Sequence, residues 1–151
     1  KFGFVGRLEI PGPPPNPLGV GLRVILEDSA GQQVFDATVP GGQYTNASKV
    51  GWTLNAANTI ATYRNTSTTI APIAGIVKIV LRSLPLNNQY LIKVFGKKGN
   101  YAVTPGRAVK VTVITSPPLA DAGQCGEMTY PGPKPTPACV WTPSGSVLRC
   151  K

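Results

Sequence analysis

The sequence predicts an all-β protein, an antiparallel β-sandwich of the immunoglobulin or fibronectin type with roughly eight to ten strands. Three observations favour this class. Apolar and polar residues alternate in short segments that recur about every ten residues. Glycine and proline, with 17 and 16 residues, interrupt the chain often, while charged residues make up only 14% of it. No segment shows a helical period, so parallel strands joined by helices are not expected.

The chain length of 151 residues fits one domain, and a domain of this size buries roughly two-thirds of its unfolded surface without metals. Residues 1–151 are therefore predicted to form a single β-sandwich domain, of which 117–151 is a Pro/Cys-rich tail ending in a hairpin. A closed barrel is the alternative fold. The exact topology stays open because the immunoglobulin pattern of paired cysteines flanking a tryptophan is absent.

The first predicted strand covers residues 2–10. Its inward residues are Phe2, Phe4, Leu8 and Ile10, and its outward residues are Val5, Arg7 and Glu9. The run PGPPPNP follows, and its prolines cannot donate the hydrogen bonds of a sheet. This run is expected to be an extended connector between sheets, although proline-rich runs also serve as ligands for other proteins.

The next elements follow the same alternation. Residues 22–39 are expected to form a hairpin with a turn near Asp28, and residues 41–51 a loop. Trp52 and Leu54 begin a further strand, which a turn joins to the strand IATYRN. Three long strands then show the best alternation, within 75–84, 89–99 and 108–116, and they are expected to lie together at the centre of one sheet.

The charge is strongly positive and unevenly spread along the chain. Lys and Arg number 15 and Asp and Glu number 6, which gives a net charge of +9. No acidic residue occurs between Asp36 and Asp121. A positive potential is therefore expected over one region of the fold, with anionic partners as its natural ligands.

Side-chain parity gives these charges a location. If the three long strands are neighbours, their outward residues form one apolar and basic face. The predicted contact residues of this face are Lys78, Arg82, Lys93, Lys97, Lys98 and Lys110, interleaved with Val80, Phe95 and Ile114. The alternative interpretation is that spaced lysines only keep sheet faces and edges soluble. Trp52, Tyr63, Tyr90 and Trp141 are candidates for stacking on sugars if exposed, although core packing is favoured for Trp52 and Tyr90.

The three cysteines lie close to the end of the chain. In the hairpin CVWTPSGSVLRC, a turn centred on Ser144 and Gly145 places Cys139 opposite Cys150, as a non-hydrogen-bonded pair that suits a disulfide. Cys125 is then the odd thiol. The alternative bridge joins Cys125 to Cys139 and leaves Cys150 free. Either bridge pins the tail and indicates an oxidising, extracytoplasmic compartment.

The sequence offers little for catalysis. It contains no histidine, so the common general base and the Ser/His and Cys/His pairs are missing. The six acidic residues are scattered, which makes paired-carboxylate catalysis or a calcium site unexpected. Three thiols without histidine match no structural zinc pattern. The prediction is that the chain is not an enzyme, uses no cofactor and holds no metal.

A resemblance adds to this interpretation. The segments VFDATVPGG at 34–42, GW at 51–52, GQCGE, YPGP, PAC and the terminal LRCK resemble uncharacterised secreted β-sandwich modules of environmental bacteria that have a Cys/Pro-rich C-terminal tail. The resemblance implies a β-sandwich and an extracytoplasmic location. It implies no catalytic residues.

Together these features predict a non-enzymatic structural or interaction module of a larger extracytoplasmic assembly, such as a surface layer, filament or envelope complex. Its expected partners are other protein subunits of the assembly, including copies of itself. The alternative is a module that binds carbohydrate or another anionic polymer. No specific nucleic acid partner is expected, and the longest apolar stretch is too short for a membrane span. A signal peptide, if one existed, would already have been removed.

Overall fold

The structure is a computed structural model that describes residues 1–97, 99, 101, 103, 107–118, 123–132, 136–142, 144 and 146–151. The strands are β1 (Phe2–Glu9), β2 (Leu22–Asp28), β3 (Gln33–Val39), β4 (Val50–Leu54), β5 (Ile60–Asn65), β6 (Ile76–Ser83), β7 (Gln89–Gly96), β8 (Val109–Ile114), β9 (Cys125–Tyr130), β10 (Cys139–Trp141) and β11 (Leu148–Cys150). The helices are short, α1 (Pro17–Val20) and the 3-10 turn η1 (Ile73–Gly75).

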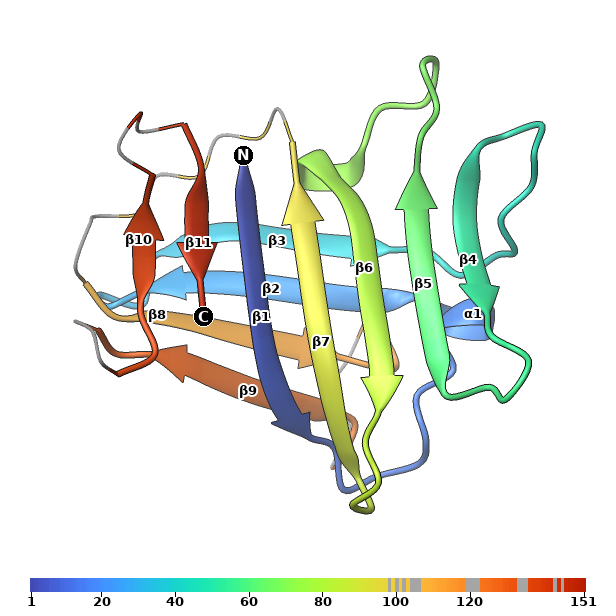
Figure 1. Cartoon of the computed structure of the whole chain (residues 1–151), viewed down its shortest axis with the longest axis horizontal. Coiled ribbons are helices and arrows are strands. Elements are labelled where there is room, and N and C mark those ends of the chain that lie inside the picture. The colour runs from blue at the N-terminus through green and yellow to red at the C-terminus, as the bar shows by residue number, and fades with distance from the viewer. Residues whose placement is uncertain are drawn as a thin grey trace.

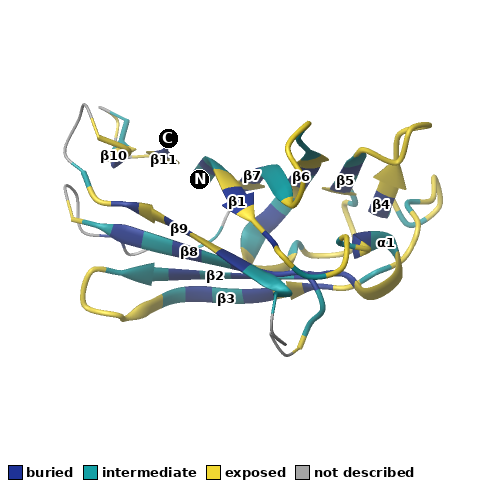
Figure 2. Cartoon of the chain, turned by 90° about the horizontal axis from the view of Figure 1, so that it is seen from below, coloured by how far each residue is buried: buried dark blue, intermediate teal, exposed yellow. Residues whose placement is uncertain are grey.

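The strands form two packed sheets, which confirms the predicted β-sandwich (Figures 1 and 2). The large sheet has seven strands in the order β10-β11-β1-β7-β6-β5-β4, and the small sheet has four in the order β3-β2-β8-β9. Strands of the two sheets cross steeply (Figure 1), as in orthogonal sheet packing. With seven and four strands the sandwich is larger than the four-plus-three arrangement of an immunoglobulin constant domain.

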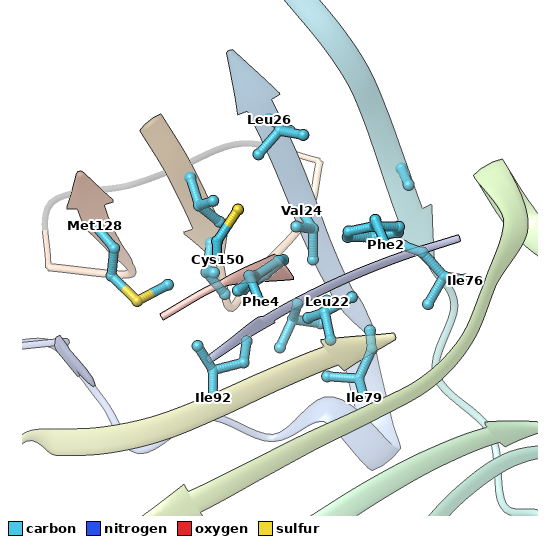
Figure 3. Close-up of a cluster of buried hydrophobic side chains, with 14 of the residues drawn as sticks. Phe2, Phe4, Leu22, Val24, Leu26, Ile76, Ile79, Ile92, Met128 and Cys150 are labelled. Atoms are coloured by element: carbon cyan, nitrogen blue, oxygen red, sulfur yellow. The ribbon is translucent and has the colours of Figure 1, made fainter. Parts of the chain in front are cut away.

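The core lies between the sheets and is built from alternate residues of nearly every strand. Figure 3 shows aromatic and aliphatic side chains from both sheets meeting there. Trp52, Phe4, Ile92 and Val94 are completely inaccessible to solvent. The inward residues predicted for the first strand are all buried. Burial of this kind contributes about 1.5–3 kcal/mol for each large apolar side chain.

The two sheets are in close contact where β9 passes β1. A Cβ atom at Gly6 would lie 1.9 Å from Met128 Sδ and 2.9 Å from the Tyr130 hydroxyl, so a side chain at this position would force these two side chains to move. The Tyr130 hydroxyl donates a hydrogen bond to the Val5 carbonyl, at 3.1 Å. The desolvation that accompanies this burial raises the pKa of Tyr130 well above its usual range. This contact fixes the outward residues of β1 on the surface of the large sheet.

The three long strands do not lie together, which corrects the sequence-based expectation. β6 and β7 are neighbours in the large sheet, whereas β8 pairs with β2 and β9 in the small sheet. Alternation assigns a residue to one side of its strand, but it says nothing about which strand lies beside it. The chain therefore crosses to the other sheet between β7 and β8.

The proline-rich run is a connector between the sheets, as predicted. It leaves β1 in the large sheet and leads through α1 to β2 in the small sheet. Gly12 donates a backbone hydrogen bond to the carbonyl of Gly123, at 2.7 Å, which ties the run to the segment before β9.

The C-terminal region is more integrated than the predicted tail. Residues 125–130 form β9, an edge strand of the small sheet that buries Gly126, Met128 and Tyr130. β10 and β11 pair antiparallel in the predicted register, with Cys139 opposite Cys150. β11 then pairs with β1 in parallel and thereby joins the large sheet. The described residues thus hold eleven strands, which exceeds the expected number.

The disulfide joins Cys139 to Cys150, so the first of the two predicted pairings is confirmed. Ala138 and Lys151 exchange both of their backbone hydrogen bonds, at 3.0 and 3.2 Å, which makes the adjacent cysteines a non-hydrogen-bonded pair. Their Cα atoms lie 4.0 Å apart. The predicted centre of the turn lies partly outside the described residues, because Gly145 is not among them.

Candidate functional site

The outer surface of the large sheet carries a group of cationic side chains from five neighbouring strands. We call this surface the basic face. Its cations are Arg149 on β11, Arg7 on β1, Lys93 on β7, Lys78 and Arg82 on β6, and Arg64 on β5. All are exposed except Lys93, which is half-buried. Glu9 at the end of β1 is the one acidic residue that the described strands place on this surface.

The structure brings four of the predicted contact residues together. Lys78 and Arg82 lie on β6, Lys93 lies beside them on β7, and exposed Lys97 directly follows β7. Lys98 falls outside the described residues. Because β6 and β7 are adjacent, the cluster predicted from parity exists on this side of the molecule.

The prediction was wrong for Lys110 and Ile114, which belong to the small sheet. Lys110 forms ion pairs with Glu27 on β2, at 2.9 Å, and with Glu127 on β9, at 3.6 Å. The hydrogen bond to Glu27 is the main cause of a raised pKa at Lys110. Ile114 is buried, with an exposed fraction of only 4%. Neither residue is available to a ligand on the basic face.

The remaining ion pair also lies on the small sheet. Arg23 donates two hydrogen bonds to Asp36, from Nε to Oδ1 at 2.8 Å and from Nη2 to Oδ2 at 2.5 Å. Arg23 Nη1 additionally donates to the Pro118 carbonyl at 2.8 Å. The hydrogen bonds from Arg23 lower the pKa of the Asp36 carboxyl group. Most of the cationic charge of this sheet is therefore neutralised within the chain.

The basic face has no such compensation within the described part of the chain, where every ion pair lies on the small sheet. Arg64 on β5 stands directly opposite Lys78 on β6. Directly opposed like charges destabilise a sheet, whereas opposed unlike charges stabilise it by roughly 0.2–1 kcal/mol. This uncompensated cationic pair is the clearest electrostatic anomaly of the described surface.

Two hollows open on the basic face. The Lys78 hollow has a volume of about 720 Å³ and is lined by Arg64, Asn65, Thr66, Ser67, Pro72, Val77, Lys78, Phe95 and Lys97. The Arg149 hollow has a volume of about 340 Å³ and is lined by Lys1, Phe2, Gly3, Val5, Phe95, Gly96, Lys97, Val147, Arg149, Cys150 and Lys151. Neither lining contains an acidic residue. Both volumes fall in the range of ligand pockets, roughly 300–1,000 Å³.

Phe95 and Lys97 line both hollows and therefore lie between them. Phe95 is 39% exposed. The aromatic residues considered from the sequence are less accessible: Trp52 and Tyr63 are buried, while Tyr90 and Trp141 are half-buried and pack against the core. The Trp141 indole also donates a hydrogen bond to the Val103 carbonyl, at 3.2 Å. The exposed aromatic ring of this face is thus Phe95.

Sequence reasoning missed three members of this site, namely Arg7, Arg64 and Arg149. Parity correctly placed Arg7 on the outward side of its strand, but the position of that strand in the sheet was not known. β11 joins this surface through a parallel pairing that links the two ends of the described chain, and no local sequence signal indicates such a pairing. Register across strands would have been needed to find all three.

The other acidic residues and thiols of the described chain do not gather into a metal site. The described residues bring no three potential metal ligands of the His, Cys, Asp or Glu type together. Glu27 and Glu127 both form ion pairs with Lys110. Cys125 is a half-buried free thiol at the start of β9. Among the described residues, neither helix has the length and apolar character that crossing a membrane requires.

Fold and surface together define a class, a disulfide-linked two-sheet β-sandwich with a strongly basic outer face on its larger sheet. No family model, curated protein or solved structure matches the chain. The resemblance to secreted bacterial modules therefore stays a prediction.

Proposed function

We propose that this chain is a non-enzymatic binding module whose basic face binds an anionic polymer. The observation that carries the proposal is the opposition of Arg64 and Lys78 at a hollow whose lining holds no acid. A polyanion lying over these side chains would offset the repulsion between them and release its own counterions. Of the two functions considered from the sequence, this geometry favours polymer binding.

The extent of the surface supports a polymer rather than a small ion. The cations are spread over five adjacent strands, from Arg149 on β11 to Arg64 on β5. Adjacent strands lie about 4.8 Å apart, so these two side chains project from backbones separated by roughly 19 Å. A ligand that engages both hollows must span a comparable distance.

The Cys139–Cys150 disulfide fits an oxidising compartment, and we propose a secreted or cell-surface location. The wider role as a structural module of a surface layer, filament or envelope complex stays a prediction. Concentration-dependent oligomers in light scattering, without retention on polyanions, would favour that role over polymer binding.

The test is affinity for immobilised heparin as a function of salt. The wild-type chain should bind at low salt and elute as salt is raised. Arg64→Gln/Lys78→Gln should weaken binding about tenfold and reduce the slope of log K against log salt by roughly one for each cation removed, as for phosphate contacts.

Lys78→Gln and Lys110→Gln form a matched pair, because each removes one positive charge from a central strand of its sheet. Lys78→Gln should weaken heparin binding, and Lys110→Gln should leave it unchanged. The proposal fails if the wild-type chain is not retained at low salt, or if the two variants lose equal affinity while both remain folded by circular dichroism.

A further inference from the structure

We propose that the polymer is an acidic polysaccharide that crosses the strands of the large sheet over the Phe95 ring, with its anionic groups in the two flanking hollows. This inference rests on the proposed function and names its ligand class.

The register of the large sheet aligns the relevant side chains in one transverse row. Arg149 lies opposite Gly3, Gly3 opposite Phe95, Phe95 opposite Lys78, and Lys78 opposite Arg64. Outward residues at successive opposed positions share one face of a sheet. A ligand following this row would meet a cation, an aromatic ring and then two cations.

The Phe95 ring packs over Gly3 on the neighbouring strand β1. A Cβ atom at position 3 would lie 3.4 Å from Phe95 Cδ1 and 3.7 Å from Cε1, so the ring packs against the glycine on the neighbouring strand. The ring therefore covers bare backbone on β1 while 39% of the residue stays exposed between the hollows. Contact with Gly3 restricts the ring before a ligand arrives, which reduces the entropy lost on binding.

An aromatic ring between cations selects a polymer that alternates an apolar surface with anionic groups. The face of an aromatic ring is electronegative and attracts the positive edges of C–H groups, which sugar rings present. Carboxylate or sulfate groups of the same polymer would reach Lys78 on one side, Arg149 on the other, and Lys97, which lines both hollows. Polyphosphate has charge but no ring, and Phe95 would add nothing to its binding.

Single-stranded nucleic acid is the competing ligand class. Its binding proteins stack successive bases on several aromatic side chains along a basic groove. Phe95 is the one aromatic residue that the described strands place on the basic face. A single ring bordered by two cationic hollows therefore favours a saccharide over a strand of stacked bases.

The decisive variant is Phe95→Ala, compared with the wild-type chain in binding to polygalacturonate, chondroitin sulfate, long-chain polyphosphate and poly(dT). We expect the Kd for the acidic polysaccharides to rise about tenfold and the Kd for polyphosphate to stay within twofold. Phe95→Tyr keeps the ring and should retain wild-type affinity for the polysaccharides. Thermal unfolding of both variants checks that the sheet is intact.

The outcomes separate the two proposals. Absence of wild-type binding to every polyanion overturns the proposed function and this inference together. Binding of all polyanions with no effect of Phe95→Ala, or with an equal loss for polysaccharide and polyphosphate, leaves the function standing and overturns the ligand class. A larger loss for poly(dT) than for the polysaccharides also overturns it, in favour of nucleic acid.

Discussion

The outer faces of the two sheets differ in how their cationic side chains are paired. On the small sheet Glu27 stands opposite Lys110, and Arg23 holds Asp36 through two hydrogen bonds. On the large sheet Arg64 stands opposite Lys78 with no acid beside them in the described structure. Both faces belong to one fold, so the fold does not require unpaired cations. The difference supports the proposal that an anionic ligand complements the basic face.

The primary structure already contains this asymmetry. Four of the six acidic residues, Glu27, Asp28, Asp36 and Glu127, lie on the strands of the small sheet. The strands β4 to β7 come from the stretch between Asp36 and Asp121 that has no acid. Folding therefore converts a charge gradient along the chain into a difference between two surfaces.

The largest expected loss of stability follows from removing the disulfide that holds β10 and β11 together at the edge of the large sheet. Cys139→Ala/Cys150→Ala opens a disulfide loop with a sequence separation of 11, and loop closure of this length stabilises by about 2–3 kcal/mol. Urea unfolding should show a corresponding drop in free energy. Affinity for polygalacturonate should also fall, because β11 supplies Arg149 to one hollow, while the ion pairs of the small sheet are untouched.

The control for this prediction is urea unfolding of the wild-type chain in its oxidised and reduced forms. Reduction should reproduce the loss seen in the double alanine variant. Equal urea midpoints for the oxidised, reduced and mutated chains would show that the tail adds nothing to the large sheet.

A smaller loss of stability is expected when acid pH protonates Asp36 and breaks its ion pair with Arg23 on the small sheet. Arg23 lowers the pKa of Asp36 in the folded chain, relative to about 3.9 for an unperturbed aspartate. The stabilisation is therefore present above the unfolded pKa and is lost as the pH falls through the folded pKa. Asp36→Asn should reduce stability at pH 7 by about 0.5–1 kcal/mol and flatten the decline of the urea midpoint below about pH 4.

Heparin binding should behave differently over the same pH range. Lysine and arginine remain charged in acid, so the basic face should keep its affinity in both the wild-type chain and Asp36→Asn, provided that the chain stays folded. A parallel loss of stability and heparin affinity on acidification would contradict the separation of the two faces.

The sequence predicted which side chains of a strand face the core better than it predicted which strands lie next to one another. Alternation correctly buried Phe2, Phe4, Leu8 and Ile10, because the period of two residues is a property of a single strand. Centring the hairpin turn on Ser144 and Gly145 correctly placed Cys139 opposite Cys150. This geometry favoured the Cys139–Cys150 disulfide but left the Cys125–Cys139 bridge open, and the structure contains the former.

Non-local pairing was beyond the reach of this reasoning. The assignment of β8 to the small sheet and the parallel pairing of β11 with β1 depend on contacts between distant segments, which alternation does not encode. For that reason Lys110 was wrongly placed on the basic face. The grouping was correct for the residues of β6 and β7 and the residue after β7, which are Lys78, Arg82, Lys93 and Lys97. The strand β9 was missed because CGEMTY combines a glycine, a methionine and a tyrosine on its buried side, a weak apolar signal inside a Cys/Pro-rich segment.

The smallest change in stability is expected from giving the basic face an acid of its own. Val80 is half-buried on the outer side of β6, opposite Lys93 on β7 and Thr62 on β5. Val80→Glu would create a cross-strand ion pair with Lys93, so the unfolding free energy should change by no more than about 0.5 kcal/mol. Heparin affinity should nevertheless fall several-fold, because the new carboxylate repels the polymer and neutralises one cation.

Thr38→Glu supplies the matched control, since it adds the same charge to the small sheet, where Thr38 is exposed opposite Arg23. This variant should retain wild-type heparin affinity. If Val80→Glu and Thr38→Glu weakened binding equally, the polymer would be responding to the net charge of +9 and not to the arrangement of cations on one face. A selective loss in Val80→Glu would instead show that the position of the charge, at nearly constant stability, decides whether the polymer binds.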